Sequence, residues 1–305
     1  MGRRLVNRNK IKRTKAELAF DIIAYTICMV LMVVFAYPFY YLLINTISNN
    51  TLVNINKVVL YPIGIHFENY KAVLTLPRLR DAAILTVART LLGTGAALMF
   101  KAYAAYLFSK QEMWHRKLWY RLAVTTMYFS AGMIPIYLNI KNLGLLDTFW
   151  VYIIIHLFAA GNVILIKTFM ESLPASLEES AEIDGAGYVT RFFRIVLPLS
   201  KPILATIGLF DAVAHWNNMG DTKLYITSQK LFTLQYVLYE YYEQVKSLQE
   251  TMAENGVDLN TMEKLASATP IRLTLTAVTV IPVMCIYPYI QKYYVKGVMI
   301  GAVKG

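Results

Sequence analysis

The stretch PASLEESAEIDGAGYVTRFFRIVLP, residues 174–198, separates two apolar runs that are each long enough to cross a membrane. Polar groups are not tolerated against lipid, so this stretch must face water or another protein. Pro174 ends the preceding helix because proline breaks a helix interior. Ser176 and Glu179 have the spacing of a capping box, which predicts that a new short helix begins there.

The same stretch also predicts a turn and a second helix. Asp184-Gly185 is expected to end the first helix, since glycine accepts the left-handed conformation at a helix terminus. A second, apolar and basic helix is expected at about 187–196, and Pro198 and Pro202 begin the next apolar run. The segment is therefore predicted to be a helix–turn–helix along one face of the membrane. An ordinary amphipathic loop remains the alternative from the residues alone.

Composition decides the class of the protein. The chain has 305 residues, of which 57% are hydrophobic and 16% charged, whereas soluble domains carry about 25% charged residues. We therefore predict an integral membrane protein. The net charge of +11 fits basic residues collected on the cytoplasmic side better than nucleic-acid binding. Cys28 and Cys285 lie in apolar runs without metal-binding or disulfide spacing, so both are expected to be packing residues.

The predicted fold is all-α, a bundle of six transmembrane helices with a short polar helix on the cytoplasmic side. About 20 apolar residues are needed for each crossing. The expected spans are about 22–44, 82–108, 122–140, 148–166, 198–216 and 272–290. They define a basic cytoplasmic N-terminus (1–20), a six-span transmembrane domain (21–295, with a polar inner loop at about 172–198 and an outer segment at about 217–271) and a cytoplasmic C-terminal tail (296–305).

The distribution of basic residues predicts the orientation. Segments expected inside hold 18 of the 30 Lys and Arg residues, and the longer outer segments hold 10. This bias follows the positive-inside rule and places both termini in the cytoplasm. We therefore expect a multi-pass membrane protein, in contact with membrane lipids; the resemblance described below implies a bacterial cell membrane.

Apart from Lys201 and Arg272 at the span ends, three charged residues lie within the expected spans. Lys101, near a span end, is expected to extend to the interface. Arg89 lies about two turns inside its span and either faces a cavity or partner or lies among the outer headgroups. Asp211 is costly in a membrane, at about 2.5–3.5 kcal/mol, so it is expected to face a cavity or a partner.

A few polar and aromatic residues are candidates for contact with a ligand. Phe232, Tyr236, Tyr239 and Tyr242 share one helical face, although that face is equally suited to packing on neighbouring spans. The amide and indole groups near the outer ends of spans four and five complete the set. The candidate substrate-path residues are Asn162, Asp211, Trp216, Asn217, Tyr236 and Tyr239.

The pattern Glu179-Ser180-Ala181-x-x-Asp184-Gly185-Ala186, followed by Ile195-x-Leu197-Pro198, resembles the EAA loop of bacterial ABC importer permeases. Residues 130–135, 143–145 and 216–217 resemble the carbohydrate-uptake branch, and the match resembles the smaller permease of a maltose importer. The tail, 291–305, resembles a subgroup associated with complex oligosaccharides. Ser180 departs from the usual alanine, and Arg89-Thr90-Leu91 departs from asparagine-threonine-leucine.

The resemblance implies a type I importer permease without catalytic or metal-binding residues of its own. The chain has no G-x-x-x-x-G-K-[ST] loop, so it cannot hold nucleotide, and ATP and Mg²⁺ are expected on a partner. The implied partners are a second, homologous permease, a dimer of ABC ATPase subunits, an extracellular solute-binding protein and an oligosaccharide. The implied ATPase-coupling residues are Glu179, Ser180, Ala181, Asp184, Gly185 and Ala186.

Two other classes compete with this prediction. A secondary transporter driven by an ion gradient would use paired carboxylates or broken helices at the midplane, and Asp211 is the one candidate carboxylate. An intramembrane enzyme would need a recognisable catalytic group, but the four histidines show no HExxH pattern and no serine pairing. Both are weaker than an importer permease.

Overall fold

The computed structural model describes residues 14–255, 268–286 and 288, and its elements within these ranges are all helical. The predictions for the basic N-terminus before residue 14, for 256–267 of the outer segment and for the C-terminal tail lie outside the described residues. Two compact units make up the chain, residues 1–67 and residues 68–305. The all-α class is confirmed for the described part.

The first unit contains one long apolar helix. Helix α1 (Lys15–Thr46) begins at a capping box, in which the Glu17 backbone donates to the Thr14 hydroxyl at 3.2 Å and the Thr14 backbone donates to the Glu17 carboxylate at 2.8 Å. Its large apolar side chains from Leu18 to Leu43 are exposed around the helix, which is the pattern of a helix that meets lipid or other helices. A short helix, α2 (Asn50–Asn54), follows.

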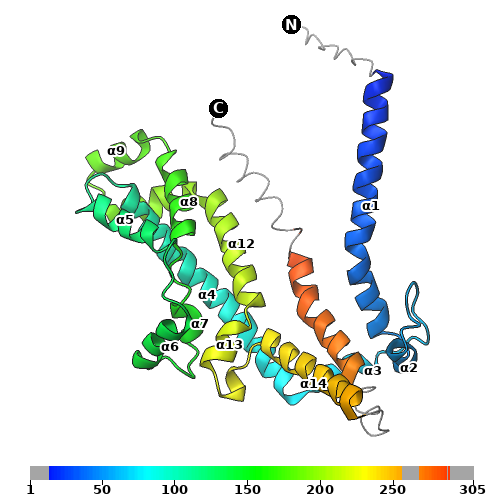
Figure 1. The fold of residues 1–305 in the computed structure, drawn as a ribbon. Coiled ribbons are helices and arrows are strands. Elements are labelled where there is room, and N and C mark those ends of the chain that lie inside the picture. The colour runs from blue at the N-terminus through cyan, green and yellow to red at the C-terminus, as the bar shows by residue number, and fades with distance from the viewer. Residues whose placement is uncertain (1–13, 256–267, 287, 289–305) are drawn as a thin grey trace. The chain divides into compact units, whose positions relative to one another are not determined.

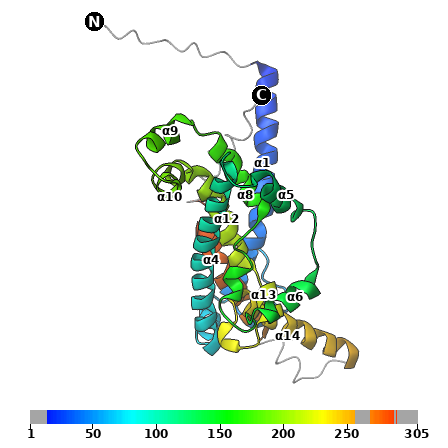
Figure 2. The same ribbon diagram turned by 90° about the vertical axis from the view of Figure 1, so that its left-hand side faces the viewer.

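The second unit is built around α4 (Pro77–Ser109), which packs against α8 (Ala160–Glu171) and α12 (Lys201–Asn217). One buried cluster surrounds Tyr106 and Phe192, and another surrounds Tyr152. Figures 1 and 2 show α9 and α10 at one end of this unit and α14 at the opposite end. The unit therefore carries different polar segments at the two ends of one helical core.

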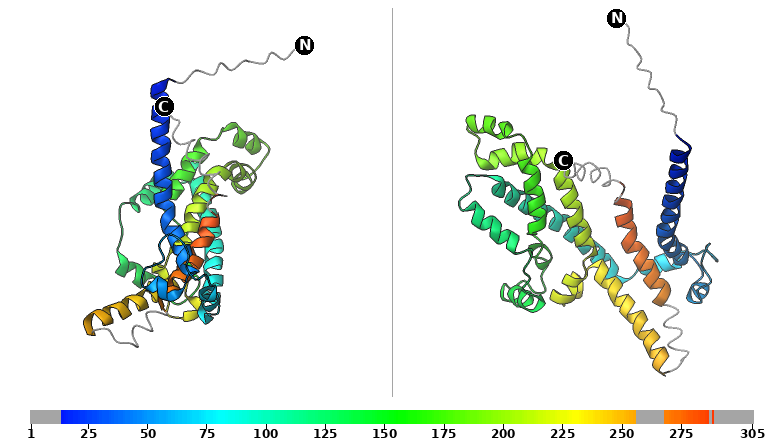
Figure 3. Two further views of the ribbon diagram at one scale, coloured as in Figure 1. Left: turned by 90° about the vertical axis from the view of Figure 1, so that its right-hand side faces the viewer. Right: turned by 45° about the horizontal axis from the view of Figure 1, so that its top comes forward.

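Shorter helices complete the second unit, and most of them flank the long ones. Figure 3 shows the same elements from two further directions. They are α3 (Glu68–Leu74), α5 (Arg116–Thr125), α6 (Met133–Asn142), α7 (Val151–Ile154), α13 (Gly220–Tyr225), the 3-10 turn η2 (Gln229–Leu231), α14 (Leu234–Asn255) and an unlabelled helix, Ala268–Ile286.

Three described helices are long and apolar enough to cross a membrane, namely Lys15–Thr46, Arg78–Ser109 and Ala268–Ile286. A fourth is added if the pair Tyr188–Leu199 and Lys201–Asn217, bent by 82°, counts as one span. The predicted number of six is therefore not reached by continuous helices in the described part. The expected third and fourth spans are each divided into two short helices, α5 with α6 and α7 with α8.

The break in the expected third span has a local cause. Gly132 has a φ of +86°, and its backbone N–H donates to the Ser130 hydroxyl at 3.3 Å. A backbone conformation with positive φ cannot continue an α-helix, so α6 begins afresh at Met133. The apolar composition of 122–140 predicted one continuous span and gave no indication of this interruption.

The predicted helix–turn–helix is present as a series of short elements. Helix α9 (Ser176–Ile183) and α10 (Tyr188–Arg191) are joined through Gly185, whose φ is +83°. A π-helix, η1 (Phe192–Val196), and α11 (Leu197–Leu199) continue α10 up to Ser200, where the chain bends into α12. The position of the glycine turn is the one predicted from the sequence.

The predicted capping box at Ser176 and Glu179 is wrong. Ala175 occupies the cap position and already has right-handed helical φ and ψ, and α9 has no side-chain cap. A capping side chain requires an extended backbone at the cap residue. The Glu178 backbone N–H donates to the Ala175 carbonyl at 3.0 Å, so the helical turn starts too early for Ser176 to cap it.

Candidate functional site

Helix α9 is attached to the core of its unit through Glu178. This carboxylate forms an ion pair with Lys110 and accepts a hydrogen bond from the Tyr106 hydroxyl at 3.0 Å. Tyr106 is fully buried in α4. Glu178 therefore connects the short polar helix to the longest helix of the unit, at the end where α4 terminates.

The segment after the glycine turn is held by a second ion pair and by aromatic rings. Glu182 of α9 lies 2.7 Å from Arg191 of α10, which is buried and also lies over the Tyr188 ring at 4.5 Å. Phe192 packs edge-on against Tyr103 of α4, with ring centroids 5.1 Å apart. The helix–turn–helix is thus closed on itself and packed on the bundle.

The remaining surface of α9 is exposed. Glu179 is exposed, and within the described residues its side chain has neither an ion pair nor a hydrogen bond. Ile183 is 86% exposed although it is apolar. An apolar residue beside an unpaired carboxylate on a rigidly attached helix is suited to contact with another protein.

Arg89 is completely buried in α4, which decides between the two environments left open by the sequence. It forms an ion pair with Asp221 of α13, donates to the Asn218 carbonyl at 2.9 Å, and lies over the Tyr152 ring at 4.4 Å. The Tyr152 hydroxyl lies 2.8 Å from the Thr222 hydroxyl. Arg89 therefore faces a protein partner inside the unit and does not lie among headgroups.

A second buried pair joins α4 to α12. Lys101 is 2% exposed, and its ammonium lies 2.7 Å from Asp211. The expectation that Lys101 extends to the interface is wrong, because the nearby carboxylate compensates its charge within the bundle. Asn162 of α8 donates to the same carboxylate oxygen at 3.3 Å, so three helices meet at Asp211, which faces a partner as expected.

Two histidines lie between the buried pairs. The His156 ring lies 2.8 Å from Asp221 and 5.1 Å from the His215 ring, at a steep interplanar angle of 82°. His215 lies against Gly93 so closely that a Cβ there would be 2.6 Å from the imidazole. We call Arg89, Lys101, His156, Asp211, His215 and Asp221 the polar column.

The chain is similar over nearly its whole length to known permeases. It is 35% identical over 301 residues to Protein LplC of Bacillus subtilis strain 168, covering 96% of this chain and 97% of that protein. It is 33% identical over 286 residues to the polygalacturonan/rhamnogalacturonan transport system permease protein YtcP of the same organism, covering 94% and 98%. No family model matches the chain.

A solved structure has the same fold. A chain of a bacterial ABC transporter involved in the import of the acidic polysaccharide alginate matches with a TM-score of 0.81 and 28% identity, covering 92% of this chain and 99% of that one. The chain belongs to the carbohydrate ABC importer permease family.

Membership of the permease family decides the function class. The permease is a subunit of an ABC sugar importer and is not itself an enzyme, because a partner ATPase hydrolyses ATP. The alternative of an ion-driven secondary transporter is wrong. Importer permeases work with a partner permease, an ATPase and a solute-binding protein. The similarity and the apolar helices indicate that the chain is a membrane protein of bacteria.

The permease brings together some of the predicted substrate-path residues and separates others. Asn162 and Asp211 are in contact. The Trp216 indole donates to the Thr279 carbonyl at 3.1 Å, which joins α12 to the helix Ala268–Ile286. Asn217 is exposed and accepts a hydrogen bond from Gln235 of α14 at 3.0 Å. Asn162 and Asp211 therefore lie inside the bundle, and Asn217 lies beside the first residues of α14.

The aromatic face of α14 is only partly available. Phe232 lies before α14 in extended backbone and so is not on the predicted helical face; it is buried and packs edge-on against Tyr236, with ring centroids 4.6 Å apart. The Tyr239 hydroxyl accepts a hydrogen bond from Lys223 at 2.8 Å, which raises the pKa of Lys223 above its usual range. Tyr242 is exposed. Packing against neighbouring residues therefore accounts for Phe232 and Tyr236, which agrees with the alternative interpretation that these aromatic side chains pack on neighbouring elements.

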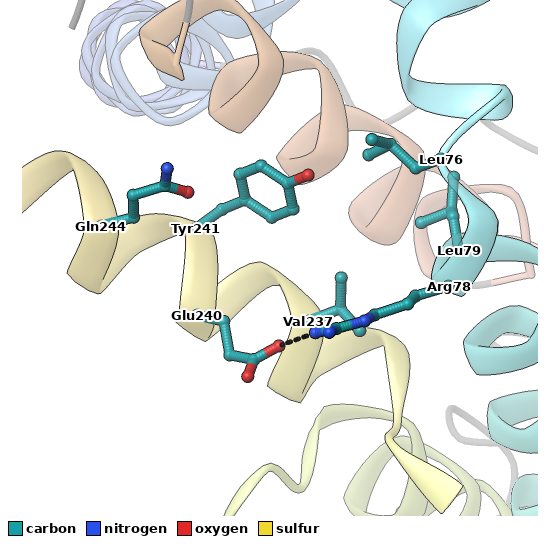
Figure 4. Close-up of a pocket in the computed structure, with 7 residues that line it drawn as sticks. All are labelled: Leu76, Arg78, Leu79, Val237, Glu240, Tyr241 and Gln244. Atoms are coloured by element: carbon teal, nitrogen blue, oxygen red, sulfur yellow. Dashed lines mark ion pairs between the residues drawn. The ribbon is translucent and has the colours of Figure 1, made fainter. Parts of the chain in front are cut away.

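A separate open groove of about 390 Å³ lies between α14 and the start of α4 (Figure 4). Figure 4 shows the Tyr241 ring extending from α14 toward Leu76, with Gln244 beside it. Glu240 and Arg78 border the groove and lie 3.7 Å apart, both well exposed. Tyr236 and Tyr239 do not belong to its lining.

Sequence reasoning missed Asp221, His156 and Glu178 as members of these sites. Asp221 follows the fifth expected span in a segment that was considered only as a polar outer loop. A buried arginine in a span nearly always needs a carboxylate or carbonyl partner. Searching for acidic residues near span ends would have placed Asp221 among a few candidates, although no local pattern distinguishes it.

Proposed function

We propose that this permease forms half of the translocation path of an oligosaccharide importer and is moved through α9 by a separate ATPase. The relative YtcP is named for polygalacturonan and rhamnogalacturonan, and the solved transporter imports alginate. Both are saccharide chains, which supports an oligosaccharide as cargo. A second, homologous permease would supply the other half of the path, and an extracellular solute-binding protein would deliver the sugar.

Six membrane crossings fit this role, with two of them made by broken helices. Helices α5 with α6, and α7 with α8, occupy the expected third and fourth spans. Broken helices occur at membrane depth where protein or a water-filled cavity surrounds them. An even number of crossings would leave both termini and α9 on one side of the membrane, and the excess of Lys and Arg in the inner segments favours the cytoplasm as that side. An ATPase dimer with ATP and Mg²⁺ would meet α9 there.

The proposal rests on one observation, namely that the three glutamates of α9 differ in their contacts: two form ion pairs within the chain and one is exposed. Glu178 and Glu182 hold α9 to α4 and α10, so a force applied to α9 would reach the bundle. Glu179 is exposed and would pair with a basic group of the ATPase, a contact worth about 1.5–3 kcal/mol. Gly185 supplies the turn, and Ser180, Ala181, Asp184 and Ala186 would allow close docking.

The substrate path is proposed to include Asn162 and Asp211 inside the bundle and Trp216 and Asn217 at the outer end of α12. Tyr236 and Tyr239 would border it on the outer side. Asp211 combines burial with a polar neighbourhood from α4 and α8, which is the arrangement that small-molecule sites use to orient a ligand.

Uptake by the assembled importer tests the proposal. The permease is reconstituted with its partner permease, ATPase and binding protein in proteoliposomes, and ATP-dependent uptake of maltotriose, stachyose and trigalacturonic acid is measured. Glu179→Lys and Gly185→Val are expected to insert normally but to abolish uptake and uncouple ATP hydrolysis. Gly187→Ala is the matched control, because Gly187 has an ordinary φ of −70° and open space around it. Normal uptake by both test variants would disprove the coupling role.

A further inference from the structure

A small cavity lies inside the polar column. Its volume is about 120 Å³, and its lining includes Lys101, Asp211 and His215 as well as the apolar Phe158 and Ala214. At about 30 Å³ for each water molecule, it has room for about four waters or for a group of similar size. The lining residues come from α4, the break between α7 and α8, and α12.

Two of the lining residues each carry a buried polar atom that lacks a partner within the part of the chain that the structure describes. Oδ1 of Asp211 accepts from Lys101 and Asn162, whereas Oδ2 accepts no hydrogen bond. Nδ1 of His215 is also unpaired. Asp211 is 8% exposed and His215 is 3% exposed. Buried polar atoms are nearly always hydrogen-bonded, so two such atoms beside one cavity point to a polar ligand.

The lining selects the chemistry of that ligand. The Lys101–Asp211 pair carries no net charge, which disfavours a bare ion. A carboxylate oxygen accepts hydrogen bonds, and an imidazole nitrogen either donates or accepts. Phe158 adds an aromatic surface whose ring packs edge-on against Phe100 at 6.5 Å. Hydroxyl groups on a partly apolar ring match this set of an acceptor, a second polar atom and an apolar wall.

We propose that this cavity binds hydroxyl groups of one sugar residue of the transported oligosaccharide, with Asp211 Oδ2 as the acceptor. His215 makes the second polar contact, and Phe158 covers the apolar side of the sugar. The proposal rests on the proposed function, and it assigns to this subunit a specific contact with the cargo. Gly93 acts as a positioning residue, because only a residue without a side chain leaves the His215 ring where it lies.

A cavity-filling variant tests the site without removing any polar group. Ala214→Leu places extra volume in the cavity, and Ala212→Leu makes the same change two residues away on α12, in the lining of a different, apolar pocket. In the reconstituted importer, with whichever of maltotriose, stachyose and trigalacturonic acid the unmodified complex takes up fastest, Ala214→Leu is expected to raise the KM for uptake about tenfold. Ala212→Leu is expected to leave KM within about twofold.

A second pair of variants covers the case in which Ala214→Leu fails to assemble. Phe158→Ala and Phe100→Ala remove the two halves of one ring contact, but only Phe158 lines the cavity. Only Phe158→Ala is expected to raise KM, and size-exclusion profiles check that both complexes assemble. Equal KM values within each pair would mean that the cavity holds water only and would overturn the proposal. If the unmodified complex took up none of the three sugars, the proposed function would fail as well, so the two failures are distinct.

Discussion

The helix–turn–helix that begins with α9 and the polar column differ in how their charged residues are compensated. On α9 the glutamates lie at the surface, and their partners Lys110 and Arg191 come from the neighbouring ends of helices. In the polar column the carboxylates of Asp211 and Asp221 are buried, and their partners lie on α4, 110 and 132 residues earlier in the chain. The first arrangement leaves the Glu179 carboxylate exposed, and the second buries nearly all of its charged groups.

Because of this difference, variants in the two regions are expected to affect different properties, namely the stability of the fold and the rate of transport. A surface ion pair is worth about 0–1 kcal/mol, whereas removing one member of a buried pair costs about 3–5 kcal/mol because a charge is left without compensation. Variants in the polar column should therefore act first on the folded state of the permease. Variants on the exposed face of α9 should act on transport while leaving the folded state intact.

The largest effect is expected from Asp221→Ala. The change leaves the fully buried Arg89 without its carboxylate, and the expected loss is about 3–5 kcal/mol of the free energy of unfolding. The measurement is the unfolding midpoint of the purified complex in detergent, together with the amount of folded permease in membranes.

The double variant Arg89→Leu/Asp221→Leu is the control for this prediction. Replacing a whole buried pair by apolar residues is often nearly neutral, so the double variant should be more stable than Asp221→Ala alone. If the double variant were no more stable, the ion pair would not be what compensates the buried charge.

An intermediate effect is expected from Gly93→Ala. The new methyl group would meet the His215 ring at 2.6 Å, and overpacking of this kind costs about 1–3 kcal/mol. Gly95→Ala is the matched control on the same helix, since nothing lies within 4 Å of its Cβ position. It should gain about 1 kcal/mol from helix propensity. Thermal unfolding of the two complexes should thus shift in opposite directions, and a shift in the same direction would contradict the contact.

The same contrast explains what could be predicted from the sequence. The glycine turn at Gly185 and the short helices on either side follow from local rules, and the structure has them in place. The pairing of Arg89 with Asp221 follows from no local rule, because the partner is chosen by tertiary packing. The same applies to Lys101, for which a local preference for the interface was outweighed by Asp211.

The sequence also predicted the starts and interruptions of helices poorly. Ser176 and Glu179 had the right spacing for a capping box, but the backbone of Ala175 was already helical. The box formed instead at Thr14 and Glu17, where the cap residue is extended with a ψ of 157°. A pattern of side chains predicts a cap only if the backbone before it is free to be extended, and that depends on how the preceding helix ends.

A smaller effect on stability is expected from Gly185→Ala. The left-handed φ of +83° costs a residue with a Cβ about 1–2 kcal/mol. Gly187→Ala at φ −70° should cost nothing measurable. Hydrogen exchange of the α9 amides should increase in the first variant only, because the strain lies in the turn that ends α9. Equal exchange in the two variants would show that the turn relaxes freely.

The smallest effect on stability, and the sharpest test of the comparison, is expected from exchanging the roles of adjacent glutamates. Glu178→Gln weakens the contacts with Lys110 and Tyr106 and should lower stability by about 0.5–1 kcal/mol. Glu179→Gln removes an exposed charge and should leave the unfolding midpoint unchanged, yet it should reduce uptake more strongly than Glu178→Gln does. The two measurements would then rank the variants in opposite orders. A single common order would mean that α9 acts on transport only through the stability of the bundle, and the exposed face would lose its proposed role as the contact with the ATPase.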